Sequence, residues 1–182
     1  FDVHDLIGFS GEDLIVTRND MNHAAEIFSY NLKKSTWKQL TNVNTATYST
    51  LALSKTERRY VTATDGKKML VWVILPPNFD ATKKYPTLLF CQGGPQAPLT
   101  QSYSFRWNFQ LMAANGYVVV APNRRGMQGH GVEWNEQISK DWGGQVMDDY
   151  LSAIDDVAKE SYVDKARLGC VGASYGGYSV FY

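Results

Sequence analysis

One serine of this sequence lies in a pattern typical of a catalytic nucleophile. Ser174 is the central residue of a Gly-x-Ser-x-Gly run at 172–176, after an apolar stretch and before a helical pattern. A sharp turn from strand to helix lifts such a serine clear of the sheet, at the cost of a strained backbone angle. Gly172 and Gly176 are expected because larger side chains would collide in the turn. We predict a nucleophile at Ser174; the alternative is a glycine-rich turn with an idle serine.

An acyl transfer at Ser174 would also require hydrogen-bond donors for the oxyanion that develops on the substrate. A glycine-rich loop at 92–95 follows a strand-like run, and its two glycines allow the backbone to approach a substrate closely. We therefore predict the backbone N–H of Tyr175 and that of Gly94 or Gly93 as the donors. The alternative for the loop is an ordinary turn between a strand and a helix.

The chain offers no suitable base for Ser174. In hydrolases with this serine motif the chain order is serine, then Asp or Glu, then His. His4, His23 and His130 all precede the serine. We expect the first two to be surface or turn residues, and His130 to lie on a loop where it could line a cleft. The acid and the base are therefore expected beyond Tyr182, in a longer hydrolase of which the chain alone is inactive.

Two arginines, Arg124 and Arg125, directly follow the apolar run at 117–121. A buried arginine that braces this loop and an arginine that touches substrate are equally good explanations. We name Arg125 as a candidate substrate-binding residue on the second explanation.

Other titratable groups have plainer explanations. Cys91 and Cys170 lie in apolar strand-like runs and are expected to be buried free thiols. No residues have the spacing of metal ligands, so we expect neither a metal site nor a cofactor. A solvated helix face is expected for four aspartates: Asp148, Asp149, Asp155 and Asp156.

Composition excludes some classes of partner. The 182 residues are 44% hydrophobic, which favours a packed core, and Lys plus Arg equals Asp plus Glu at 18 each. Without net basic charge we expect no nucleic-acid partner and no attraction to anionic membranes. The longest apolar runs are strand-sized, so no membrane span is expected.

The elements that must position these residues fall into two parts. Residues 1–55 contain short alternating strands at 13–18, 26–31 and 36–40, separated by polar turns. This spacing is typical of an antiparallel meander, such as one blade of a β-propeller. Extra hairpins attached to the following domain are the alternative.

Residues 56–182 alternate strands with helices, which predicts a doubly wound α/β sheet. An Asp-Gly hairpin turn joins the first two strands, and Gly116 is a natural helix C-cap. The fold class is α/β, with the N-terminal part of an α/β-hydrolase sheet ending just after the serine turn. The expected strands are 59–63, 69–75, 87–91, 117–121 and 167–172, and the expected helices are 105–115, 146–159 and one from 174 onward.

Four motifs together resemble the prolyl oligopeptidase family of serine peptidases, in the same order along the chain. They are Gly93-Gly94-Pro95, Asn123-x-Arg125-Gly126, Asp141-Trp142-Gly143 and the serine run at 172–178. The closest likeness is to bacterial dipeptidyl peptidases of the V type and to acylaminoacyl peptidases. In this family a β-propeller precedes the peptidase domain, so the resemblance implies that residues 1–55 are its final blade.

The resemblance implies that Ser174 attacks a peptide carbonyl and becomes acylated. Tyr175 would donate its N–H to the oxyanion, and its ring would border the S1 pocket. Family members often carry His or Tyr where this sequence has Gln92, and in some the tyrosine hydroxyl is an oxyanion donor. Gln92 is therefore a candidate substrate contact, and either its amide or the backbone of Gly94 would be the second donor.

The leading hypothesis is a serine exopeptidase that hydrolyses short peptides. An esterase on the same fold and an inactive fragment or binding module are the alternatives, because the serine motif does not choose between amides and esters. The resemblance leaves room for a homodimer of the full-length protein. The V-type likeness implies a periplasmic or extracellular protein, and the other relatives imply a cytoplasmic one.

Overall fold

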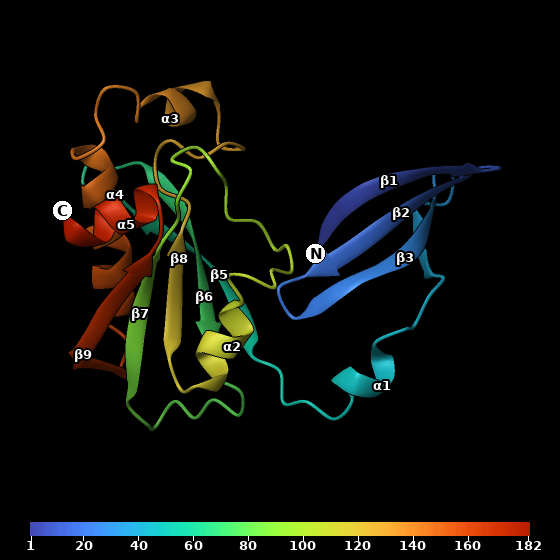
Figure 1. Cartoon of the computed structure of the whole chain (residues 1–182), viewed down its shortest axis with the longest axis horizontal. Helices are drawn as coiled ribbons and strands as arrows, with labels where there is room; N and C mark the ends of the chain where they lie inside the picture. Colours follow the sequence, from blue (N-terminus) through green and yellow to red (C-terminus); the bar gives the residue numbers. More distant parts are fainter. The chain divides into compact units, whose positions relative to one another are not determined.

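The computed structural model describes all residues, 1–182. The chain divides into two compact units, each of which is described by itself. Unit 1 comprises residues 1–53 together with 100–110, and unit 2 comprises residues 54–99 together with 111–182. Figure 1 follows the chain through both units.

Unit 1 is built on a four-stranded antiparallel meander in the order β1-β2-β3-β4. The strands expected at 13–18, 26–31 and 36–40 are confirmed, and the first strand was missed. Two register shifts interrupt its pairing with the second, so its residues do not alternate cleanly. The elements are β1 (Asp2–Ser10), β2 (Asp13–Asp20), β3 (His23–Asn31), β4 (Thr36–Gln39) and the short helix α1 (Thr45–Tyr48).

Unit 2 contains a five-stranded mixed sheet in the order β5-β6-β8-β7-β9 (Figure 1). The first two strands form the expected hairpin, in which Gly66 turns with a φ of 85°. Parallel pairing, as expected from continuous apolar runs, joins β8 to β7 and β7 to β9. The strands are β5 (Lys55–Thr62), β6 (Lys68–Leu75), β7 (Tyr85–Cys91), β8 (Val118–Pro122) and β9 (Val163–Gly172). The chain is therefore α/β with two sheets, as predicted at that level.

Helices complete this unit and cover its sheet. The helix α4 packs on β5, β7 and β8, and α5 packs on β7 and β9. One apolar cluster joins these helices to the sheet through residues such as Val73, Val120, Leu89 and Val146. The elements are α3 (Val132–Glu136), α4 (Gln145–Val157) and α5 (Tyr175–Phe181), and α2 (Phe109–Ala114) spans the change between the units. None of the helices is both long enough and apolar enough to cross a membrane.

Two expectations about these elements were wrong. The helix predicted from residue 105 begins only at Phe109, and Phe105 is 86% exposed. The hydroxyl of Ser104 accepts a hydrogen bond from the N–H of Trp107, and such a local turn competes with a helix. Cys170 is exposed rather than buried, because β9 is the edge strand of the sheet and its middle residues lie in the open.

Candidate active site

Ser174 occupies a sharp turn between the end of β9 and the start of α5. Its φ of 58° and ψ of −127° lie outside the usual regions for a residue with a side chain, which confirms the expected strain. The residue is exposed, and its side chain makes no capping hydrogen bond to the helix. The turn thus presents a free hydroxyl, which is what a nucleophile requires.

The glycines on either side of the turn are required by space. A Cβ on Gly172 would lie 2.5 Å from the carbonyl oxygen of Gly176 and 2.7 Å from that of Cys91. A Cβ on Gly176 would lie 2.0 Å from the same Cys91 oxygen. All three distances are far below van der Waals contact, so the expected collision is confirmed. The turn forms only because its backbone can pack directly on the end of β7.

The loop predicted to supply an oxyanion donor lies against the serine turn. A Cβ on Gly93 would lie 2.6 Å from the carbonyl oxygen of Ala173 and 3.4 Å from the Cβ of Ser174. Gly94 has a φ of 76°, which favours glycine, and is exposed. The fold therefore brings the loop at 92–95 close to the serine, which is where oxyanion donors must lie. The assignment of the donors stays a prediction.

Tyr175 places its ring inward. Its side chain is 5% exposed, and its hydroxyl donates a hydrogen bond to the carbonyl oxygen of Trp142 at 2.7 Å. The two rings meet edge to face with centroids 5.3 Å apart, and burial raises the pKa of the Tyr175 hydroxyl. The backbone N–H of Tyr175 lies at the start of α5. It comes before the N–H of Tyr178, which donates a hydrogen bond to the carbonyl oxygen of Ser174. That the ring of Tyr175 borders an S1 pocket stays a prediction.

Arg124 is fully buried and reaches the glycine loop. Its guanidinium donates to the carbonyl oxygen of Gln92 at 3.1 Å, to that of Arg125 at 2.7 Å and to that of Pro95. Its Nε donates to the hydroxyl of Tyr150 at 3.0 Å. Four of the five N–H donors of an arginine are therefore in use.

Arg125 is 3% exposed and joins two carboxylates. It grips Asp65 with two bonds of 2.5 and 2.7 Å, and its backbone N–H and Nε both donate to Asp149, at 2.9 and 3.1 Å. The arginine holds the pKa of Asp65 down at about 2. With its donors directed at carboxylates, the geometry favours a brace over a substrate contact for Arg125.

The expectation that Asp149 is solvated was wrong. The residue is 0% exposed, and burial raises the pKa of its carboxyl against the opposing effect of Arg125. The buried face of α4 includes Val146, Tyr150 and Ala153, and Asp149 lies at i+3 from the first of these. That spacing was the signal in the sequence that could have placed Asp149 on the inner face. The other three aspartates are not fully buried.

Asn123 is a further residue of this region to which sequence reasoning gave no role. It is 1% exposed and pairs with the backbone of Leu99, accepting from the N–H at 2.9 Å and donating to the carbonyl oxygen at 3.0 Å. Trp72 donates to the same carbonyl oxygen. Leu99, four residues after the glycine loop, is thus fastened to the residue that follows β8. Only the Asn-x-Arg-Gly resemblance pointed to this residue.

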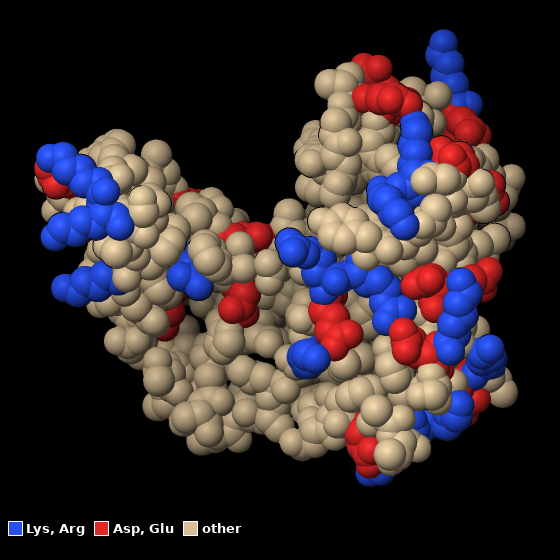
Figure 2. All heavy atoms as spheres, turned by 180° about the vertical axis from the view of Figure 1, so that it is seen from behind, with Lys and Arg blue, Asp and Glu red and all other residues tan.

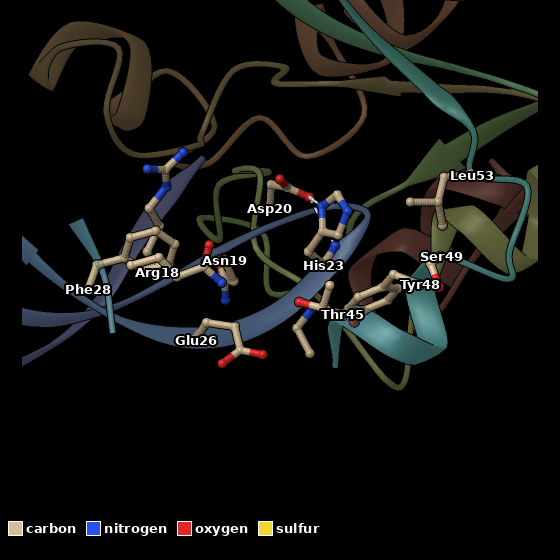
Figure 3. A pocket seen from close by; sticks show the side chains of 12 residues that line it. Arg18, Asn19, Asp20, His23, Glu26, Phe28, Thr45, Tyr48, Ser49 and Leu53 are labelled. Atoms are coloured by element: carbon tan, nitrogen blue, oxygen red, sulfur yellow. Dashed lines mark hydrogen bonds and ion pairs between the residues drawn. The ribbon is translucent and has the colours of Figure 1, made fainter. Parts of the chain in front are cut away.

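The histidines lie elsewhere, as expected for two of them. His4 is exposed on β1, and His23 ends the β2–β3 turn, where it contacts Asp20 at 2.8 Å. Figure 3 shows the side chains of Asp20 and His23 pointing toward one another in a hollow of unit 1 with a volume of about 600 Å³. The predicted site residues all belong to unit 2 and do not line this hollow. His130 is exposed on the loop after β8, and its role in a cleft stays a prediction.

Charges of both signs are mixed on the surface. Figure 2 shows acidic and basic side chains interspersed over the face that it presents. Acidic and basic side chains also form ion pairs, such as those of Arg59 with Asp156 and Glu160. This agrees with the equal numbers of acidic and basic residues in the sequence.

Comparison with known proteins places this geometry in a family. Dipeptidyl-peptidase 5 of Porphyromonas endodontalis is 50% identical over 180 residues, which cover 98% of this chain and 26% of that protein. Dipeptidyl-peptidase 5 of Porphyromonas gingivalis is 48% identical over 181 residues, with the same coverage. The model of the prolyl oligopeptidase family matches residues 103–182. The chain is thus similar to proteins of the prolyl oligopeptidase family.

Solved structures of this family agree with the fold. Acylaminoacyl peptidase of Pyrococcus horikoshii superposes with a TM-score of 0.85 at 26% identity, over 99% of this chain and 28% of that one. The chain spans about a quarter of the length of the curated relatives it matches.

Proposed function

We propose that the protein containing this chain is a serine exopeptidase, of the dipeptidyl or acylaminoacyl kind, that forms an acyl-enzyme at Ser174. The observation that carries the proposal is the strained, exposed serine with Gly93 packed against its turn. The relatives support the choice of substrate: two are named dipeptidyl-peptidase 5. One solved acylaminoacyl peptidase is in complex with a peptide chloromethyl ketone.

The proposed reaction follows from these positions. The hydroxyl oxygen of Ser174 adds to the substrate carbonyl carbon, its proton passes to a base, and the carbonyl electron pair moves onto oxygen. The N–H of Tyr175 and that of Gly94 or Gly93 hold this oxyanion. Collapse restores the carbonyl and breaks the C–N bond, and the departing amine takes the proton. Water then hydrolyses the ester. We propose that the base and its acid partner lie outside residues 1–182.

The same proposal includes the identity of the two domains and the cellular location of the protein. Residues 56–182 would be the N-terminal part of an α/β-hydrolase domain, and the meander in residues 1–55 would be the last blade of a β-propeller. The likeness to the dipeptidyl-peptidase 5 relatives favours a periplasmic or extracellular location, and fractionation of the source cells tests it.

Labelling and hydrolysis by the full-length protein test the function. We expect a fluorophosphonate probe to modify Ser174, with the site mapped by peptide mass spectrometry. Dipeptidyl or acyl-aminoacyl amides should be hydrolysed, and Ser174→Ala should lower kcat by about 10⁴-fold or more. Equal activity of the Ser174→Ala variant would refute the nucleophile.

An esterase is the second candidate, because the serine turn serves either ester or amide. Short acyl esters measured beside the peptide amides separate the two. Cleavage of the esters alone would remove the peptidase proposal and leave Ser174 as an esterase nucleophile.

A further inference from the structure

Arg124 is a buried cation whose contacts in this chain include no carboxylate. Its side chain is 0% exposed, and its hydrogen bonds go to three carbonyl oxygens and one hydroxyl. Burying a charge without a counter-ion is costly, and an apolar side chain of similar volume would usually fill such a space at lower cost. Packing alone therefore does not explain an arginine at this position.

The contacts of Arg124 bracket the two glycines of the loop. Its guanidinium bonds the carbonyl oxygen of Gln92, one residue before Gly93, and the carbonyl oxygen of Pro95, one residue after Gly94. Two fixed carbonyls on either side limit how the intervening peptide units rotate. Arg124 therefore helps to set the direction of the glycine N–H groups.

The same guanidinium also contacts the other side of the serine turn. Its central carbon lies 4.8 Å from the centre of the Tyr175 ring, in the geometry of a cation–π contact. The hydroxyl of Tyr150 accepts a hydrogen bond from the Nε of Arg124 and donates one to the carbonyl oxygen of Gln92 at 3.3 Å. Tyr150 thus links Arg124 to the glycine loop. Arg124 is thus shared between the glycine loop and the residue that follows Ser174.

We propose that Arg124 is a positioning residue that holds the two halves of the oxyanion hole, the loop at 92–95 and Tyr175, at their working separation. This inference rests on the proposed function. Only a planar, multiply donating cation can bond two loop carbonyls while its face lies on a ring. Its charge, which no carboxylate here neutralises, also favours an anion developing nearby.

Steady-state kinetics of the full-length protein on a dipeptidyl or acyl-aminoacyl amide test the proposal. Arg124→Met keeps much of the volume and removes both the donors and the charge. We expect kcat to fall about 100-fold, as for a misplacement of about 1 Å in a catalytic group, while KM stays within about threefold of the wild type. Arg124→Lys keeps the charge but cannot bond both carbonyls, and it should restore only part of kcat.

A transition-state analogue gives a readout that a merely structural role would not move. A peptidyl trifluoromethyl ketone adds to Ser174, and its carbonyl oxygen becomes an oxyanion while the serine proton passes to the base. Its affinity should fall in proportion to kcat in Arg124→Met, because only the tetrahedral adduct uses the oxyanion donors. Affinity for a substrate-like product should change little.

Two further variants keep the proposal testable if Arg124→Met does not fold. Tyr150→Phe removes one hydroxyl and should lower kcat about 3- to 10-fold. Asp65→Asn is the control. It loosens the loop that carries Arg124 and Arg125 by removing a partner of Arg125, without touching Arg124, and should leave kcat within about threefold of the wild type.

Three outcomes would overturn the role of Arg124. They are a wild-type kcat in Arg124→Met or Tyr150→Phe, a loss confined to KM, or a loss of kcat that Asp65→Asn matches at equal thermal stability. If instead the wild-type protein shows neither labelling nor hydrolysis, the proposed function itself has failed.

Discussion

Gly176 and Gly177 are neighbours in α5, yet their surroundings differ sharply. A Cβ on Gly176 would meet the Cys91 carbonyl oxygen at 2.0 Å, whereas a Cβ on Gly177 would meet only the Gly172 oxygen, at 3.7 Å. The first distance requires the end of β7 to move, and the second is ordinary contact. Of these two glycines, the serine turn thus depends on Gly176 and not on Gly177.

This difference predicts opposite effects of the same substitution. Gly176→Ala should lower the free energy of unfolding by about 1–3 kcal/mol through overpacking, and should also lower kcat because the Ser174 turn shifts. Gly177→Ala should be neutral or stabilise by up to about 1 kcal/mol, through helix propensity. Denaturant unfolding of the full-length protein checks both. Equal losses in the two variants would mean that the steric argument is wrong.

At the scale of elements, one chain of charges ties three segments together. Asp65 lies in the β5–β6 turn, Arg125 follows β8, and Asp149 lies on the inner face of α4. A strand pair, a loop and a helix that are distant in sequence are thereby joined around a single guanidinium. The loop that carries Arg124 is anchored from both sides in this way.

Removing the charge of Asp65 should weaken this anchor in a pH-dependent manner. Its pKa in the folded protein, about 2, lies below the usual 3.8, so its contribution to stability is complete above about pH 4 and is lost as the pH falls toward 2. Asp65→Asn should therefore cost about 1–3 kcal/mol at pH 7, and the difference from the wild type should shrink below pH 4. Chemical denaturation at pH 7, 4 and 3 measures it; a constant difference would contradict the assignment.

At the scale of the whole molecule, substrate size is the informative variable. If the meander of residues 1–55 is a propeller blade, as we propose, access to Ser174 is restricted to short peptides. The full-length protein should then cleave short peptides and leave a folded protein substrate intact. Mass spectrometry of the products checks this, with fluorophosphonate-treated enzyme as the control. Comparable cleavage of a folded protein would contradict a restricting propeller.

The sequence alone determined most of the elements and the turn at which we predict the nucleophile. Turn residues, apolar runs and helical spacing act over a few positions, so the Asp-Gly hairpin, most strands of both sheets and the turn at Ser174 could be predicted from neighbouring residues. The start of α2 was misjudged because a serine side chain competes locally with the helix. The first strand was missed because its pairing is irregular.

Only the tertiary structure decided the roles of the buried charges. The sequence left a brace and a substrate contact open for Arg124 and Arg125, named Arg125 as a candidate substrate-binding residue, and placed Asp149 in solvent. In the fold, Arg125 takes the two carboxylates and Arg124 takes the carbonyls of the glycine loop. The physical reason is that a guanidinium bonds whatever lies within about 3 Å, and for these arginines those groups come mostly from segments distant in sequence, which only the packing of the sheet and α4 brings together.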